Sequence, residues 1–141
     1  MIYAYNLFQE VWIQMDIVLQ LHSLVRFLVL LAAVIGLLLV FFSMIAKGAN
    51  QSATAMLASL FLGLLDLQAL LGVLIILLGG LKGPLHPLVM FIALLIAHWL
   101  QTVVKRAQDS RVPVLRLVFY AVPLAIILFG LAIIGQLRLA G

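Results

Sequence analysis

Four long apolar stretches, separated by short polar segments, make up most of this sequence of 141 residues. A helix that spans a membrane needs roughly 20 predominantly apolar residues. The stretches cover residues 17–46, 53–79, 85–104 and 114–137. The segments between them carry glycine, proline, asparagine and serine, and they are so short that consecutive helices must be antiparallel neighbours. The pattern therefore predicts an all-α integral membrane four-helix bundle with up-down-up-down order.

The composition supports a membrane protein and removes several kinds of site. Hydrophobic residues make up 67% of the chain and charged residues 9%, whereas soluble domains have roughly 45–50% and about 25%. Cysteine is absent, which excludes disulfides, thiolate metal sites and c-type haem attachment. No serine–histidine–acid set or phosphate-binding loop is apparent, so an enzymatic activity is uncertain and an electron carrier or accessory subunit is favoured over an enzyme.

Residues 1–16 differ from the four spans because apolar and polar residues fall on opposite faces of a helix drawn through them. The apolar face holds Phe8, Val11, Trp12 and Met15, and the polar face holds Asn6, Glu10 and Gln14. Such a segment is typical of a helix that lies at the membrane interface. A short tail that contacts a partner is the alternative. A secretory signal is excluded because the basic region that begins such a signal is missing.

Lysine and arginine in the short connections predict the orientation. The links after the first and third spans hold Lys47, Lys105, Arg106 and Arg111, whereas the opposite side holds Lys82 and Arg138 beside acidic residues. Both termini are therefore predicted on the non-cytoplasmic side of a bacterial cytoplasmic membrane. The formal net charge of +4 follows from this topology and points to the lipid bilayer rather than to nucleic acid as a partner.

Residues 21–31 and 85–95 resemble one another and begin two spans that run in the same direction. Seven of the eleven aligned positions are identical, including His22 with His86, in a chain with only 3 histidines. The alignment indicates a two-plus-two internal repeat with its pseudo-twofold axis along the membrane normal. The first and third helices would then lie diagonally across the bundle, with the two histidines at matching depth. The second and fourth helices show no comparable match.

Two polar stripes bring the histidines to the predicted interior. His22 and Arg26 share a face that continues in small residues, and on the third helix the equivalent stripe is His86, Met90, Ala93, Ala97 and Gln101. One interpretation is that His22 and His86 ligate one haem b iron from opposite helices, with Arg26 holding a propionate or a quinone carbonyl. The other is that each histidine lies near a helix start and bonds to a loop carbonyl.

Asp66, Gln68 and His98 are three further polar residues within the spans. An ion pair between Arg26 and Asp66 would neutralise two charges that are expensive inside a bilayer. A hydrogen bond between Asp66 and His98 is the alternative, since both lie at about the same depth. Gln68 points away from Asp66 on the same helix, so one of the two must face a side cavity or a neighbouring subunit.

Three segments together resemble a family of small four-helix bacterial membrane proteins labelled cytochrome-b-like. The segments read His22-Ser23-x-x-Arg26-Phe27, Asp66-Leu67-Gln68-x-Leu70-Leu71-Gly72 and His86-Pro87-Leu88-x-Met90-x-x-Ala93. The resemblance implies b-type haem and membrane electron transfer. Some members have histidine at the position of Asp66, and many end the fourth helix with a Pro-Trp pair that is absent here.

The sequence thus leaves three functions open. The first is a membrane subunit associated with electron transfer that binds one haem b between the first and third helices, with a quinone nearby. The second is a cofactor-free accessory subunit of a larger respiratory or photosynthetic complex, packed against other membrane subunits. A proton or small-solute pathway through Asp66 and His98 is the third, although transporters usually show broken helices at the midplane.

Overall fold

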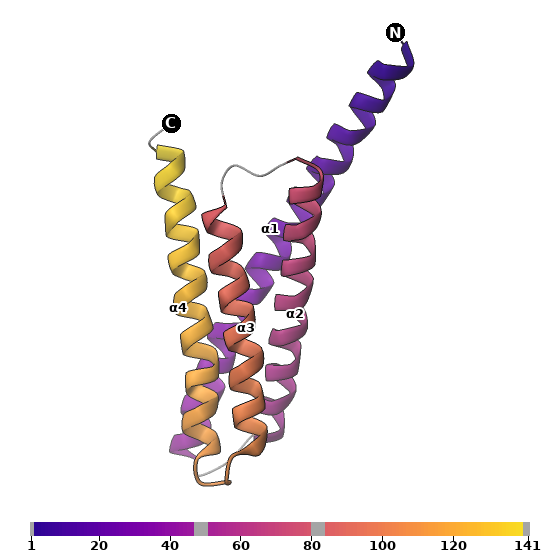
Figure 1. Cartoon of the computed structure of the whole chain (residues 1–141). Helices are drawn as coiled ribbons and strands as arrows, with labels where there is room; N and C mark the ends of the chain where they lie inside the picture. The colour runs from indigo at the N-terminus through magenta and orange to yellow at the C-terminus, as the bar shows by residue number, and fades with distance from the viewer. Residues whose placement is uncertain (1, 47–50, 80–83, 140–141) are drawn as a thin grey trace.

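The computed structural model describes residues 2–46, 51–79 and 84–139, and every regular element in these ranges is a helix. The helices are α1 (Ile2–Ile45), α2 (Gln51–Leu77), α3 (Leu85–Arg106) and α4 (Val112–Leu139), shown in Figure 1. Each contains a stretch long and apolar enough to cross a membrane. The predicted all-α four-helix membrane bundle is confirmed.

The helices form a ring in which each packs against two neighbours. Helix α1 contacts α2 and α4, and α3 contacts the same two helices, whereas α1 and α3 make no close backbone contact. The predicted diagonal placement of the first and third helices is therefore correct. Contact is most extensive within the α1–α2 and α3–α4 hairpins and least extensive between α2 and α3, so the α2–α3 side is the least tightly packed side of the bundle.

Helix α1 extends further toward the N-terminus than the span at residues 17–46 predicts. It is continuous from Ile2, its residues 13–45 are long and apolar enough to cross a membrane, and its N-terminal part projects beyond the other helices in Figure 1. The side chains that define the amphipathic faces of residues 1–12 lie outside those the structure describes, as do Lys47, Lys82 and the side chain of Arg138. The interfacial position of residues 1–16 and the orientation of the chain stay predictions.

The helix ends follow the local sequence. Helix α2 ends at Leu77, and Gly79 adopts a φ of 82° while its N–H bonds to the carbonyl of Ile76 at 3.0 Å. A left-handed residue just past a helix end is favourable only for glycine and a few others. At the start of α3, Pro84 occupies the cap position and Pro87 lies in the first turn, where a missing N–H removes no hydrogen bond.

The core combines small residues with one aromatic cluster. Ala33, Ala93 and Ala97 have no exposed surface, and such small residues let helix backbones approach closely within a bilayer. Phe61 of α2 lies with its ring centroid 5.6 Å from that of Phe119 and 5.5 Å from that of Tyr120, both on α4. The cluster ties α2 to α4 across the bundle. Polar side chains, among them His22 and His86, lie in the interior toward the end of the bundle where α3 begins.

Candidate functional site

The two stripes that the sequence assigns to the interior lie there. On α1, the stripe from His22 and Arg26 continues through Ala33, Gly36 and Val40, and on α3 it continues from His86 to Gln101; all of these residues are buried or half-buried. The spacing of these residues at every third or fourth position therefore identified the inward faces of both helices.

His22 is held against α2 by a side chain rather than by a loop carbonyl. Its Nε2 accepts a hydrogen bond from Nε2 of Gln68 at 2.9 Å. A Cβ atom added at Gly72, one turn further along α2, would lie 3.8 Å from Cε1 of the same ring. The Nδ1 of His22 and the Oε1 of Gln68 are buried without a hydrogen-bond partner. With Nε2 acting as the acceptor, the neutral ring carries its proton on Nδ1.

His86 is held in the corresponding way against α4. Its Nδ1 donates to the backbone carbonyl oxygen of Gly130 at 3.3 Å. A Cβ atom at Gly130 would lie 2.2 Å from Cε of Met90 and 3.7 Å from Nδ1 of His86, so the absence of a side chain there makes room for both. Each repeat-related histidine thus contacts the helix that follows its own. Among the described residues, their hydrogen-bond partners are a side chain and a helix carbonyl and not a loop carbonyl.

Both histidines line one cavity at the centre of the bundle. Its walls come from all four helices: His22, Arg26, Val29, Leu65, Gln68, His86, Met90, Ile127 and Leu131. The free volume is about 20 Å³, slightly more than one water molecule needs. Drug-sized and larger cofactors occupy pockets of roughly 300–1,000 Å³. A haem macrocycle therefore does not fit between His22 and His86 as the helices are packed.

Asp66 and His98 form the hydrogen bond that the alternative assignment predicts. His98 Nε2 donates to Oδ1 of Asp66 at 2.8 Å. No ion pair joins Arg26 to Asp66 or to any other carboxylate within the described residues. The expectation of an Arg26–Asp66 pair is wrong because Gln68, on the opposite side of α2 from Asp66, faces His22 and the interior. That rotation carries Asp66 to the outside of the bundle.

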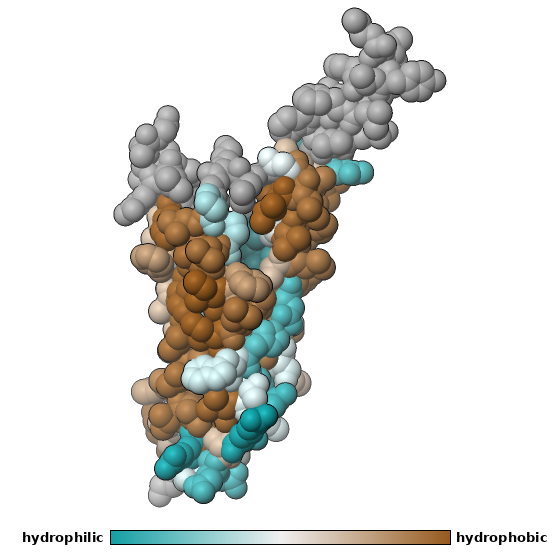
Figure 2. All heavy atoms as spheres, in the orientation of Figure 1, coloured by the Kyte–Doolittle hydropathy of each residue, from teal (hydrophilic) through white to brown (hydrophobic). Residues whose placement is uncertain are grey.

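The Asp66–His98 pair lies on the outer surface near the middle of α2 and α3. The side chains are 53% and 49% exposed, and Figure 2 shows hydrophilic side chains crossing the hydrophobic surface on this side of the bundle. Nearby hydroxyls are satisfied within their own helices, since Thr102 donates to the His98 carbonyl at 3.0 Å and Ser59 to that of Ala55 at 3.4 Å. The carboxylate and the imidazole are thus the polar groups that this surface presents outward.

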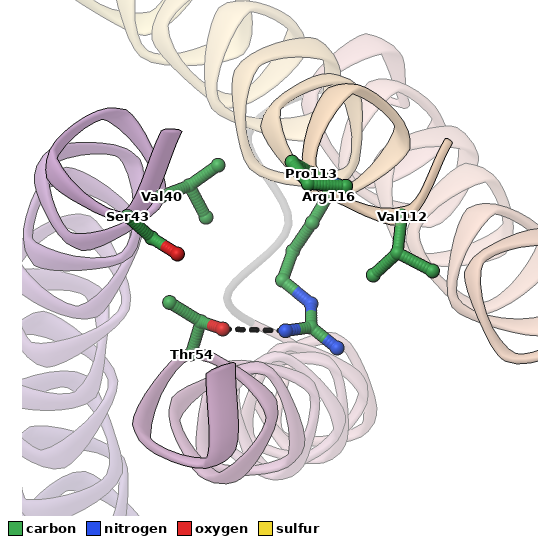
Figure 3. A pocket seen from close by; sticks show the side chains of 6 residues that line it. All are labelled: Val40, Ser43, Thr54, Val112, Pro113 and Arg116. Carbon is green, nitrogen blue, oxygen red and sulfur yellow. Dashed lines mark hydrogen bonds between the residues drawn. The ribbon is translucent and has the colours of Figure 1, made fainter. Parts of the chain in front are cut away.

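A second polar cluster, which the sequence reasoning missed, lies at the opposite end of the bundle from the two histidines. Figure 3 shows Arg116 reaching from α4 toward Thr54 of α2, with Ser43 of α1 beside them. Arg116 donates to the Thr54 hydroxyl, and the Tyr120 hydroxyl donates to the Thr54 carbonyl at 3.3 Å. The sequence signal for this cluster was the position of Arg116, a charged residue inside the fourth predicted span. The adjoining cavity is only about 10 Å³.

Comparisons with known protein families, with curated proteins and with solved structures found no match to this chain. The geometry of the described residues therefore carries the functional assignment.

Proposed function

We propose that this protein is a membrane-embedded accessory subunit that packs laterally against another integral membrane protein. The contact surface is the α2–α3 face, defined here by Gly63, Asp66, Leu67 and Leu70 of α2 with Phe91, Leu95, His98 and Thr102 of α3. The observation that carries the proposal is the half-exposed Asp66–His98 pair near the middle of two membrane-spanning helices.

The physical reason is the free-energy cost of exposing polar groups to lipid. A charged side chain at the centre of a bilayer costs on the order of 3 kcal/mol even on the mildest scale, and such residues normally face a bundle interior or a water-filled cavity. Asp66 and His98 face neither, since the interior of their own bundle is occupied by Gln68 and the apolar core. A neighbouring helix that covers the pair removes it from lipid and supplies a hydrogen-bond partner.

The rest of the face suits a helix–helix contact. Gly63 is exposed, and a Cβ atom added to it would meet nothing within 4 Å, so a partner backbone can approach closely there. Leu67, Leu70 and Leu95 flank the pair and are 42%, 57% and 54% exposed. The partner's membrane face should therefore be apolar, with at least one polar group opposite Asp66 and His98. The cytochrome-b-like resemblance supports an electron-transfer complex as its setting.

Gly63→Leu should weaken lateral assembly about tenfold, which corresponds to ~1.4 kcal/mol, without changing the fold of the isolated chain. The added side chain has free space in the monomer but holds a partner helix away from α2. The measurement is native electrophoresis of mildly solubilised membranes, which compares the fraction of chain in the larger species. Circular dichroism of the purified variant checks that the fold is intact.

The matched control is Gly135→Leu on α4, where an added Cβ also meets nothing within 4 Å. It should leave both the assembly and the fold unchanged. Equal assembly of the wild type and both variants would contradict a contact at the α2–α3 face.

A haem b carrier is the second candidate, and one observation favours it. His86 uses Nδ1 to bond to a backbone carbonyl, the arrangement that commonly fixes a metal-binding histidine and leaves Nε2 toward the metal. Against it stands the volume of about 20 Å³ between the histidines, together with the engagement of His22 Nε2 by Gln68.

We therefore expect protein purified from a haem-replete host to show no b-type bands in a dithionite-reduced minus oxidised absorption spectrum. The physical reason is the water-sized space between His22 and His86. Strong b-type bands that disappear in both His22→Ala and His86→Ala, but persist in His98→Ala, would establish the haem carrier in place of the accessory subunit.

A further inference from the structure

The central cavity combines a small volume with an unbalanced charge. About 20 Å³ is free between the four helices, which accommodates one water-sized occupant but not a ring or an extended chain. Arg26 is the only residue in its lining with a permanent charge, and none of the nine lining residues is acidic. The cavity is therefore shaped for a compact ligand and carries a positive charge.

No acidic side chain neutralises Arg26 within the part of the chain that the structure describes. The Asp66 carboxylate bonds instead to His98, on the outer surface of the bundle. Charged residues within membrane spans normally pair with an opposite charge or mark a site for a ligand or ion. A lone guanidinium in this position favours a negatively charged occupant and opposes a bare cation.

A hydrogen-bond donor accompanies the charge. His22 accepts from Gln68 through Nε2, so the neutral ring holds its proton on Nδ1, an atom that is buried without a partner. A buried donor that lacks an acceptor is costly. An anion in the cavity would provide an acceptor for this N–H and a counter-charge for Arg26.

We propose that the central cavity is a binding site for a compact monovalent anion, with Arg26 as the counter-charge and His22 Nδ1–H as a donor. Chloride is the probe ion, because it is spherical and close to a water molecule in size. This site is independent of the α2–α3 face, so its ligand can be tested whether or not a partner is bound.

The experiment measures the thermal unfolding of the full chain in detergent at constant ionic strength, with chloride replaced stepwise by gluconate, which is too large for the cavity. A ligand that binds only the folded state raises the Tm in a saturable way. We expect chloride to raise the Tm of the wild type by a few degrees and to have no effect on Arg26→Gln. Arg26→Lys, which keeps the charge, and Arg106→Gln, which removes an exposed charge at the end of α3, should retain the chloride dependence.

Line broadening of the chloride-35 nuclear magnetic resonance signal provides a second measurement that does not depend on a variant that folds. The wild type should broaden the signal, bromide should reverse the effect by competition, and gluconate should not. A Tm that is equal in both salts, together with an unbroadened signal, would show that the cavity holds water alone and would overturn the proposal. A chloride dependence that survives in Arg26→Gln would overturn it as well.

Discussion

Gly36→Val is expected to prevent the bundle from forming, or to destabilise it by at least ~3 kcal/mol, the upper end of the usual cost of overpacking. The ring of Tyr120 on α4 packs directly against Gly36 on α1. An added Cβ would lie 2.3 Å from Cε1 and 2.4 Å from Cζ of that ring. Tyr120 has no exposed surface, and its hydroxyl is bonded to the Thr54 carbonyl, so the ring cannot move aside cheaply. The measurement is the unfolding midpoint in detergent, with gel filtration to detect aggregation.

Two companion variants show whether the clash is the cause. Gly135→Val, at a glycine with nothing within 4 Å of an added Cβ, should unfold at the wild-type midpoint. Tyr120→Leu removes the ring atoms that Gly36→Val meets, so the double variant should be more stable than the sum of the two single changes predicts. Wild-type stability of Gly36→Val would show that α1 and α4 do not approach as described.

Phe61→Ala is expected to destabilise the bundle by ~2–4 kcal/mol, somewhat less than the same change in a water-soluble core. Lipid is as apolar as the protein interior, so the transfer of the side chain contributes little and the lost packing contributes most. Phe61 has no exposed surface and contacts the rings of both Phe119 and Tyr120. Unfolding of the purified chain in detergent measures the change.

The control for Phe61 is Phe129→Ala on α4. Its side chain is 62% exposed and points away from the core, so its removal leaves no cavity. A change within about 0.5 kcal/mol is expected, the usual range for surface substitutions. Equal losses for the two phenylalanines would contradict the assignment of the aromatic cluster as the packed centre of the bundle.

The sequence predicted the elements well because apolar length alone defines a membrane-spanning helix. The small-residue stripes also gave the inward faces of α1 and α3. The sequence did not show which face of α2 points inward, because leucine occurs on every face of that helix. Asp66 and Gln68 lie on opposite faces, and either could have pointed to the interior. The structure turns Gln68 toward His22 and Asp66 toward His98. Depth along a helix can be counted from its ends, whereas rotation depends on packing.

Two further features required the three-dimensional structure. The volume between His22 and His86 depends on how closely four helices approach one another, which spacing along the chain does not reveal. Arg116 lies near the start of α4 and Thr54 near the start of α2, and only the parallel course of these two helices in the bundle brings the side chains together. In both cases the missing information was the distance between helices, and it decides which polar residues form sites.

Site-directed photocrosslinking in intact membranes tests the central claim, lateral packing through the α2–α3 face, most directly. A photoreactive phenylalanine analogue at Leu67 or Leu95, beside the exposed pair, should give one discrete protein adduct, and the adduct should be lost in the Gly63→Leu background. The same analogue at Phe129, equally exposed but on α4, should give only lipid adducts. Lipid adducts alone at all three positions would contradict the claim, and an adduct of twice the chain's own mass would replace the accessory subunit with a homodimer.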